Sequence, residues 1–409
     1  MDEQLALIRA HTVDLLPEEE LRAKLASGRP LRVKLGVDPT GPDIHLGHAV
    51  VLRKLRLFQD LGHTAVLIIG DFTGLIGDPS GRNEGRPQLT REQIERNVET
   101  YQEQVFKILI PEQTEFRYNS EWCGKLTPEQ ILRLASTHTV AQMLAREDFA
   151  QRFKAEQPIS IHELLYPIFQ GYDSVAVRSD IELGGTEQKF NLLVGRELQR
   201  ANPIGGSQEP QVIITFPILV GTDGERRMGK SIGNYIGVSE PPDQMFGKIM
   251  SIPDQVMGDY FALCTDVPEE DTAHLMHDMR SGAANPRDVK RRLAREIVSL
   301  YHSVEAADRA DDTFMRVFST AREHTEEDYA ALADDVSIPA ELRDKPVWVS
   351  TALQALGLAR TRSEGARLVK GGGVYLDQRR IEDPQEEIVL KPGMLLRVGK
   401  RRVARVVAR

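Results

Sequence analysis

The first third of the chain alternates short apolar runs with segments of helical periodicity. The run RVKLGVD at 32–38 has the composition of a strand, and TAVLIIGDF at 64–72 is a nearly continuous apolar run typical of a strand buried on both faces. Between them, HLGHAVVLRKLRLFQDLGH at 45–63 carries an apolar stripe at helical spacing. We therefore predict a strand–helix–strand unit with a parallel sheet.

The rest of the first half adds helix signals and two more strands. Thr90 and Thr127 each precede a segment with Gln three residues later, which is the pattern of a capping box at a helix start. TEFRYNSEW at 114–122 and PQVIITFPILV at 210–220 are strand-like, and the helix EQKFNLLVGRELQRA follows a predicted LGG turn. Residues 1–225 thus predict an α/β, Rossmann-type doubly wound nucleotide-binding domain.

The pattern changes in the second half. Residues 226–330 contain helices separated by Pro and Gly breaks, with no strand candidate before about 345, and predict an α-helical domain. The acidic stretch 331–347 is interpreted as a linker. In residues 348–409, two helices, a glycine turn and a strand predict a small α+β module.

Charge is distributed unevenly around a net value of −9. Residues 351–409 contain thirteen Lys/Arg and six Asp/Glu, a net charge of +7, which leaves −16 for residues 1–350. A basic terminal module on an acidic body favours a polyanion partner for that module alone. The alternative is a basic tail without a partner.

Composition indicates a globular protein of several domains. A chain of 409 residues exceeds what one hydrophobic core usually supports, and 41% hydrophobic and 28% charged residues are ordinary values. The opening MDEQLALIRA is acidic and amphipathic, unlike a basic signal peptide, and no run approaches twenty apolar residues. Cys123 and Cys264 are too far apart for a disulfide framework or a metal knuckle. We expect a cytoplasmic enzyme with no membrane partner.

The turn after the first predicted strand, LGVDPTGPDIHLGH at 35–48, carries the first candidate chemistry. His45 and His48 lie three residues apart at the start of a helix, so they share one face. The spacing is compatible with a zinc pair, with an anion site at a helix N-terminus, or with one packed and one solvated histidine.

The phosphate-binding loops usual in nucleotide folds are absent from the sequence. There is no G-x-x-x-x-G-K-[ST], and no G-x-G-x-x-G follows the first strand. Thr40 with the two histidines is one alternative. The other is GTDGERRMGKSIGN at 221–234, a basic loop directly after the last predicted strand. Alone, that loop would more often be a solvated surface turn. Two such patches at opposite ends of one nucleotide fold favour a shared function.

Together these stretches resemble the signatures of class I aminoacyl-tRNA synthetases. PTGPDIHLGH resembles their "HIGH" motif, and RMGKS at 227–231 resembles their "KMSKS" loop, in the same order. GLIGDPSGR (74–82), YPIFQGYD (166–173) and LGGTEQ (183–188) resemble the tyrosyl branch. Residues 348–409 resemble the S-four-like RNA-binding module of bacterial tyrosyl enzymes.

The resemblance implies a reaction and roles at the nucleotide. ATP, with Mg²⁺ on its phosphates, and tyrosine would give tyrosyl-adenylate and pyrophosphate, and tyrosine would then pass to the 3′ end of its tRNA. The histidines would bind the nucleotide and not a metal: His45 with Thr40 at the phosphates, and His48 at the adenine–ribose end. Gly47 would let the adenine approach the helix. The side chains that would hold the leaving pyrophosphate are Arg82, Arg86, Arg227, Lys230 and Ser231.

For the amino acid, the resemblance implies a pocket along one helix face. Tyr166, Gln170 and Asp173 are spaced i, i+4, i+7 and can converge on one small ligand. Tyr166 and Gln170, with Asp78, would hold the ammonium group, and Asp173 would accept a hydrogen bond from the phenol hydroxyl. The positions that would serve the ribose and the carboxylate are Gly184, Glu187 and Gln188.

Several positions depart from the tyrosyl pattern. Lys34 stands where many tyrosyl enzymes have a Tyr that shares the phenol hydroxyl. Glu187 replaces an Asp and is one methylene longer. Arg227 and Gly229 replace the first Lys and the Ser of the loop signature. None of these changes abolishes a step.

The resemblance also implies an assembly. The family forms a homodimer through a helical insertion near 125–160, and one tRNA contacts both subunits. No DNA partner is expected. Two alternatives remain, a tryptophan–tRNA ligase of the same fold and an RNA-binding protein that keeps the fold without catalysis. The basic module and YPIFQGYD disfavour the first, and the intact motifs disfavour the second.

Overall fold

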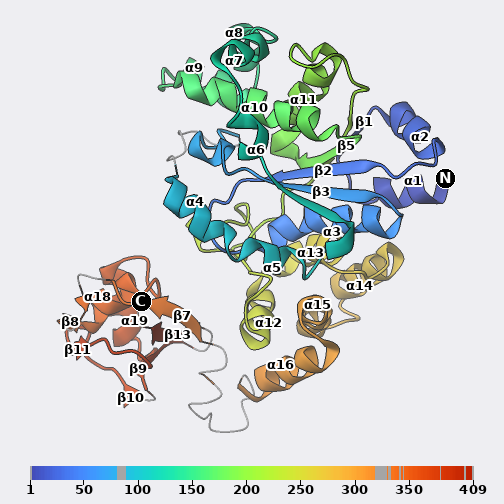
Figure 1. Cartoon of the computed structure of the whole chain (residues 1–409). Helices are drawn as coiled ribbons and strands as arrows, with labels where there is room; N and C mark the ends of the chain where they lie inside the picture. The colour runs from blue at the N-terminus through green and yellow to red at the C-terminus, as the bar shows by residue number, and fades with distance from the viewer. Residues whose placement is uncertain are drawn as a thin grey trace. The chain divides into compact units, whose positions relative to one another are not determined.

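The chain forms two compact units, seen in a computed structural model (Figure 1). One unit comprises residues 1–239 and 255–272, and the other comprises 240–254 and 273–409. Residues 226–234, which the sequence groups with the helical domain, pack in the first unit. The division into folding domains stays a prediction. The structure describes residues 2–80, 89–317, 329, 333–339, 342–343, 345–377, 379–399 and 402–407.

A six-stranded sheet in the order β1-β6-β5-β2-β3-β4 forms the centre of the first unit. Its edge strand β1 is antiparallel to β6, and the other neighbours are parallel. β6 is buried along its whole length, as strands of a covered parallel sheet are. The predicted α/β doubly wound fold is confirmed. The strands are β1 (Asp14–Leu16), β2 (Arg32–Val37), β3 (Thr64–Ile69), β4 (Thr114–Tyr118), β5 (Ile181–Gly185) and β6 (Val212–Phe216).

The direction in which the chain moves across the sheet reverses between β2 and β5. From β2 it proceeds to β3 and β4 on one side, and from β5 it proceeds to β6 on the other. In open α/β sheets, ligands bind beyond the carboxyl ends of the strands at such a reversal. The fold therefore places the candidate site where the HIGH-like turn leaves β2 and the short turn η3 (Thr186–Gln188) leaves β5.

Helices cover both faces of this sheet (Figure 1). α3 (Leu46–Asp60) packs on β2, β3 and β5, whereas α11 (Lys189–Ala201) packs on β5 and β6, with α10 (Ile161–Val177) lying along it. A Cβ atom added to Gly171 of α10 would lie 3.0 Å from the backbone nitrogen of Gly195 in α11. The two helices therefore touch without room for a side chain, which fixes α10 in place.

Both predicted capping boxes are confirmed. Thr90 and Thr127 cap α4 (Arg91–Val98) and α7 (Pro128–Ala135). Each hydroxyl accepts from the backbone N–H of the Gln three residues on, and that Gln side chain accepts from the Thr backbone N–H. The helices that follow are α8 (Val140–Leu144) and α9 (Glu147–Lys154).

The segment IELGG at 181–185 corrects one expectation. The sequence predicts its last three residues as a turn, but they belong to β5, the central partner of β2. A buried glutamate, Glu182, and two consecutive glycines give this strand none of the apolar continuity that marks β3.

The helical part of the second unit agrees with the sequence. Among the helices in the described ranges, none is both long and apolar enough to cross a membrane. The helices that follow β6 are α12 (Pro242–Ser251), α13 (Met257–Cys264), α14 (Glu269–Ser281), α15 (Pro286–Tyr301) and α16 (Val304–Val317), of which α13 belongs to the first unit.

The C-terminal module contains the two predicted helices and the predicted strand, and more strands than the sequence predicts. β7 (Asp334–Ser337) pairs in parallel with β13 (Arg402–Val407), so the expectation of no strand before about 345 is wrong. Acidic residues conceal this strand in the sequence, but Val336 packs on the core of the module and Ile338 is buried in it. The other elements are β8 (Pro346–Trp348), α18 (Val349–Ala355), α19 (Arg362–Lys370), β9 (Val374–Leu376), β10 (Arg379–Arg380), β11 (Glu387–Val389) and β12 (Leu395–Val398).

Candidate active site

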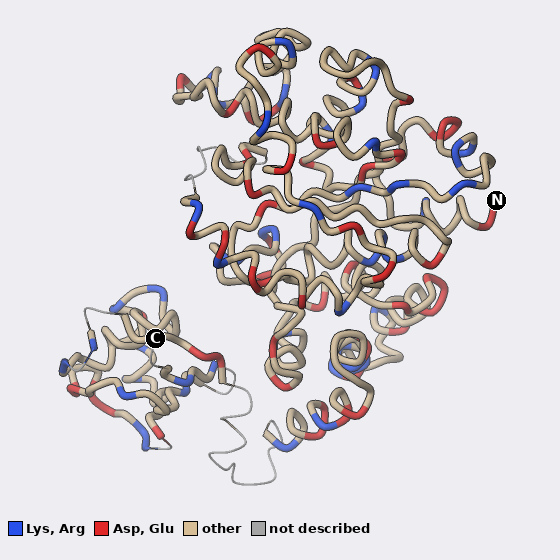
Figure 2. The backbone as a smooth tube through the Cα atoms, in the orientation of Figure 1, with Lys and Arg blue, Asp and Glu red and all other residues tan. Residues whose placement is uncertain are grey.

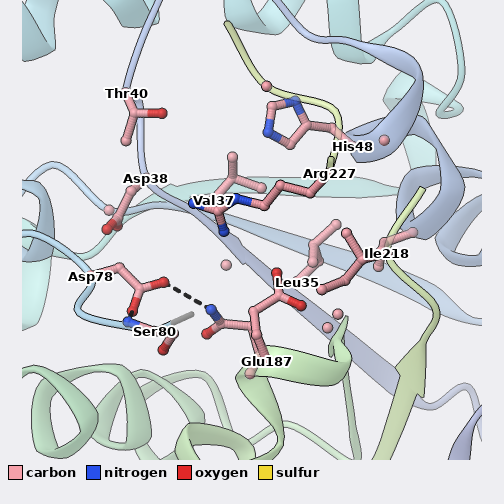
Figure 3. Close-up of a pocket in the computed structure, with 18 of the residues that line it drawn as sticks. Leu35, Val37, Asp38, Thr40, His48, Asp78, Ser80, Glu187, Ile218 and Arg227 are labelled. Carbon is pink, nitrogen blue, oxygen red and sulfur yellow. Dashed lines mark hydrogen bonds between the residues drawn. The ribbon is translucent and has the colours of Figure 1, made fainter. Parts of the chain in front are cut away.

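A pocket of about 520 Å³ opens at the carboxyl ends of β2 and β5 (Figure 3). It brings together residues from five separate stretches of the chain. Arg82 and Arg86 lie outside the described residues. The fourteen other candidate residues all line the pocket: Thr40, His45, Gly47, His48, Asp78, Tyr166, Gln170, Asp173, Gly184, Glu187, Gln188, Arg227, Lys230 and Ser231.

The two histidines lie stacked at the start of α3. His45 is the N-cap residue, and the centroids of the His45 and His48 rings are 3.8 Å apart with 19° between their planes. Burial, followed by the positive charge of Lys230, lowers the pKa of His45 to about 3. His45 is therefore neutral near pH 7 and can donate one hydrogen bond without adding a charge.

The loop at 221–234 is held in shape by one buried side chain. The Asn234 amide oxygen accepts from the Gly229 backbone N–H at 2.9 Å, and its amide nitrogen donates to the Arg227 carbonyl at 3.1 Å. These bonds tie the first half of the RMGKS segment to Asn234, at the end of the loop. Lys230 then begins the short 3-10 turn η4 (Lys230–Ile232) at the edge of the pocket.

Lys230 is the cation of this loop that meets the HIGH-like turn. Its ammonium donates to the Gly41 carbonyl at 2.9 Å and lies 5.6 Å from the ring centre of Tyr101. Burial lowers the pKa of Lys230 to about 8, so its ammonium group is still mostly charged at pH 7. A phosphate oxygen that replaced the neutral carbonyl would form a stronger, charge-assisted hydrogen bond.

At the other end of the pocket, a chain of hydrogen bonds fixes Asp78. Gln188 donates to one carboxylate oxygen at 2.8 Å, and the Ser80 backbone N–H donates to the other at 2.9 Å (Figure 3). Buried Asn191 donates to the amide oxygens of Gln188, at 3.1 Å, and Gln170, at 2.9 Å. Asn191 thereby sets the orientation of both glutamine amides.

Asp173 lies at the deep end, with its carboxylate already oriented. Trp122 donates to one oxygen at 2.7 Å, Asn119 donates to the other at 3.3 Å, and the Cys123 thiol lies 3.9 Å from the first. Burial raises the pKa of Asp173 to about 7, although the positive charge of Lys34 and these donors oppose the rise. The pocket thus ends in a buried acceptor whose charge is sensitive to its surroundings.

Comparisons with known proteins show the family. Residues 26–319 match the family described as "tRNA synthetases class I (W and Y)", and residues 347–401 match the "S4 domain". The tyrosine–tRNA ligase of Moorella thermoacetica is 51% identical over 98% of this chain and 95% of that protein. That of Thermotoga maritima is 50% identical over 99% of this chain and 97% of that protein. The chain belongs to the tyrosine–tRNA ligase family.

Solved structures of tyrosyl-tRNA synthetases share the fold. The Archaeoglobus fulgidus enzyme, crystallised with L-tyrosine, has a TM-score of 0.61 and 25% identity, over 76% of this chain and 99% of that one. A C-terminally truncated mitochondrial enzyme from Aspergillus nidulans has a TM-score of 0.63 and 21% identity, over 77% and 93%. At 21% identity, the likeness to the Aspergillus nidulans enzyme supports the fold alone.

Two departures from the tyrosine–tRNA ligase signature can be placed in the structure. Lys34 is fully buried and is not among the residues that line the pocket; its ammonium lies 2.8 Å from a carboxylate oxygen of Glu182. Glu187 does line the pocket. Burial, then the charge of Asp78, raises the pKa of Glu187, and Arg227 opposes this effect.

The sequence-based site lacks two residues that the structure adds. Asp38, directly after β2, accepts from the Tyr166 hydroxyl at 2.8 Å and from the Thr73 hydroxyl at 2.8 Å. Asn191 joins Gln170 to Gln188. Asn191 lies in the first turn of α11, three residues after the N-cap residue Gln188, but nothing in the sequence connects it to Gln170. Nothing in the sequence sets Asp38 apart from other acidic residues in loops.

Proposed function

We propose that this protein joins tyrosine to its tRNA in two steps, through a tyrosyl-adenylate formed from ATP. The observation that carries the proposal is one pocket with a neutral histidine and a half-buried lysine at one end and two oriented carboxylates at the other. Relatives with about 50% identity over nearly the whole chain are tyrosine–tRNA ligases, which favours tyrosine over tryptophan. The presence of His45, Asp78, Asp173 and Lys230 in one pocket argues against a non-catalytic protein.

In the first step, a carboxylate oxygen of tyrosine attacks the α-phosphorus of ATP. The bond from that phosphorus to the bridging oxygen breaks, and pyrophosphate leaves with Mg²⁺, which arrives on the ATP phosphates as part of the substrate. No proton has to be transferred, so the enzyme acts by positioning and by stabilising charge. Thr40 and neutral His45 donate to the phosphates. Lys230, Arg227 and Ser231 stabilise the charge on pyrophosphate, and we assign Arg82 and Arg86 to the same anion.

The nucleoside and the amino acid occupy the remaining parts of the pocket. We assign His48 and Gly47 to the adenine–ribose end, and three positions at the carboxyl end of β5 to the ribose and the carboxylate. They are Gly184 in the strand, and Glu187 and Gln188 in η3 directly after it. The ammonium group is held by Asp78, Tyr166 and Gln170, because this is where an oriented carboxylate and a fixed amide meet.

Lys230→Ala tests the assignment at the phosphates. Formation of tyrosyl-adenylate should slow about 100- to 1,000-fold, with little change in tyrosine affinity, because the charge that Lys230 neutralises appears on pyrophosphate. Stopped-flow adenylation measures the rate and the tyrosine dependence. Arg226→Ala is the matched control, since this exposed cation of the same loop pairs with Asp223. An equal loss of tyrosine affinity would contradict the assignment.

Asp173→Asn and Asp173→Ala test how tyrosine is distinguished from phenylalanine. A buried charged acceptor is left unpaired when the hydroxyl is missing, and loss of such a hydrogen bond costs about 1.5–3 kcal/mol. Both variants should lose roughly 10- to 150-fold more kcat/KM with tyrosine than with phenylalanine, measured by pyrophosphate exchange. A variant that kept the full preference for tyrosine would show that another group reads the hydroxyl.

The C-terminal module is proposed to bind the tRNA backbone. Figure 2 shows Lys and Arg positions spread over it, and the basic residues around α19 have exposed side chains: Arg360, Arg362, Arg367 and Lys370. Cations on an RNA-binding module hold phosphates and release counterions. This function implies a cytoplasmic location, where tRNA is charged.

Removal of the module tests that proposal. Because β7 belongs to the module sheet, the shortened chain should end before residue 333. It should keep pyrophosphate exchange but aminoacylate tRNA poorly, and binding of tRNA to the full chain should weaken steeply with salt. Pyrophosphate exchange is the internal control for folding of the catalytic unit. If the shortened chain aminoacylated tRNA as well as the full chain does, the proposal that the module binds tRNA would be wrong.

The helical insertion is proposed to form a homodimer interface. Four large apolar side chains more than 60% exposed lie between α7 and the start of α10, and apolar patches of this kind mark protein interfaces. They are Leu132, Val140, Phe153 and Ile161.

A charge placed in this patch should separate the subunits. Ile161→Asp combined with Phe153→Asp should shift the sedimentation coefficient from a dimer to a monomer, because an uncompensated carboxylate cannot be buried in an apolar interface. Val304→Asp is the control, since Val304 is similarly exposed, at 60%, but lies on α16. A double variant that stayed dimeric would exclude this surface.

A further inference from the structure

A buried ion pair lies behind the pocket, at the junction of the two central strands. Lys34 of β2 and Glu182 of β5 are direct neighbours in the parallel register, and both side chains are at most 1% exposed. The Lys34 ammonium is 2.8 Å from a Glu182 carboxylate oxygen. Burying two opposite charges in the interior of a sheet costs free energy, because each charge must be desolvated.

The pair is connected to α10 through defined hydrogen bonds. Lys34 donates to the Ser174 hydroxyl at 2.8 Å and to the Gln170 backbone carbonyl at 3.1 Å. The Ser174 hydroxyl in turn donates to the other Glu182 oxygen at 2.9 Å. Gln170 and Ser174 enclose Asp173 within a single turn of the helix. Lys34 therefore holds the turn from which Gln170 and Asp173 reach the pocket.

The packing around the pair leaves it no alternative arrangement. The Gln211 side-chain amide donates to the same Glu182 oxygen that accepts from the Ser174 hydroxyl. A Cβ atom added to Gly195 would lie 2.9 Å from the Ser174 hydroxyl and 3.2 Å from Glu182. The helix α11 thus closes the network at a position where only a glycine fits. Lys34 cannot reach the ligand without breaking these contacts.

We propose that Lys34, paired with Glu182, is a positioning residue for recognition of the phenol-bearing amino acid. Lys34 anchors the α10 turn and supplies a positive charge that favours the ionised form of the Asp173 carboxylate, the acceptor for the hydroxyl. Glu182 orients that ammonium and limits its effect. The inference rests on the proposed role of Asp173 and assigns to Lys34 a task behind the pocket wall, without contact with the substrate.

The charges around Asp173 determine the direction in which its pKa should shift in each variant. Burial raises the pKa of Asp173 to about 7; the Lys34 charge lowers it, as do the hydrogen bonds from Trp122 and Asn119, and the negative charge of Glu182 raises it. The Cys123 thiol also faces Asp173, and its own pKa is raised by burial and by Asp173 and Asp71, so it stays neutral. Removing the positive charge of Lys34 must therefore raise the pKa of Asp173, and removing the negative charge of Glu182 must lower it.

The test compares Lys34→Met, Glu182→Gln and the double variant. The measurement is the acid limb of kcat/KM for tyrosine in pyrophosphate exchange, which reports ionisation of the free enzyme. For Lys34→Met we expect the limb to move up by about one pH unit, with roughly tenfold lower kcat/KM at acid pH. For Glu182→Gln we expect a shift to lower pH, and for the double variant a smaller upward shift than for Lys34→Met.

A purely structural role cannot produce this result. Each single variant leaves one buried charge unpaired and should destabilise the fold. Unfolding alone would therefore change kcat/KM and its pH dependence in the same direction in both variants. Opposite shifts support the proposal; shifts of the same sign, or a limb that does not move, overturn it. If Lys34→Met does not fold, Glu182→Gln and the charge-neutral double variant still give opposite signs under the proposal.

Asp173→Asn separates this inference from the proposed function. If Asp173→Asn loses the acid limb and the preference for tyrosine while the pair variants leave the limb in place, only the role of Lys34 fails. If Asp173→Asn keeps both, the assignment of Asp173 fails, and the inference fails with it.

Discussion

The parallel pairing of β2 with β5 is the constraint on which the site depends. Because the chain leaves these neighbouring strands towards opposite sides of the sheet, a crevice forms beyond their carboxyl ends. That space becomes the pocket. β2 delivers Asp38 and the HIGH-like turn to it, β5 delivers Gly184 and Glu187, and the loop after β6 closes it with Lys230. Residues far apart in sequence share one cavity because strand order, and not a local motif, creates it.

Desolvation acts in opposite directions at the two ends of this cavity. It lowers the pKa values of His45 and Lys230 and raises those of Asp173 and Glu187, because burial always disfavours the charged form. The pocket therefore carries weaker charges than its residue types suggest. Under the proposed function, a phosphate bound at Lys230 favours the charged form of that side chain, so binding strengthens an interaction that the reaction needs.

The local features of the fold could be predicted from the sequence because they follow local rules. The β2–α3–β3 unit shows its periodicity openly, the capping boxes at Thr90 and Thr127 are formed by neighbouring residues, and the common face of Tyr166, Gln170 and Asp173 follows from helix geometry. The features that could not be predicted depend on partners distant in the chain.

Strands β5 and β7 illustrate that limit. Glu182 and two glycines hide β5, and its strand character becomes evident only beside β2, where Lys34 neutralises the glutamate. β7 is hidden by acidic residues, one of which lies 3.6 Å from Arg405 of the neighbouring strand. Asn191 belongs to the same class: its helix was predicted, but the two amides that it orients come from different elements.

Position 34 shows how a change in one side chain extends through a whole fold. A tyrosine there would remove the ammonium that pairs with Glu182 and would leave Glu182 as a buried charge without its cation, a loss typically worth about 3–5 kcal/mol. The lysine therefore cannot be considered apart from Glu182, from the Ser174 hydroxyl that bridges them, or from Gly195, which leaves the bridge its space. Under the proposed role of Asp173, selection of the substrate hydroxyl is a property of β2, β5, α10 and α11 together, and Gln170 and Asp173 are the residues of the anchored α10 turn that line the pocket.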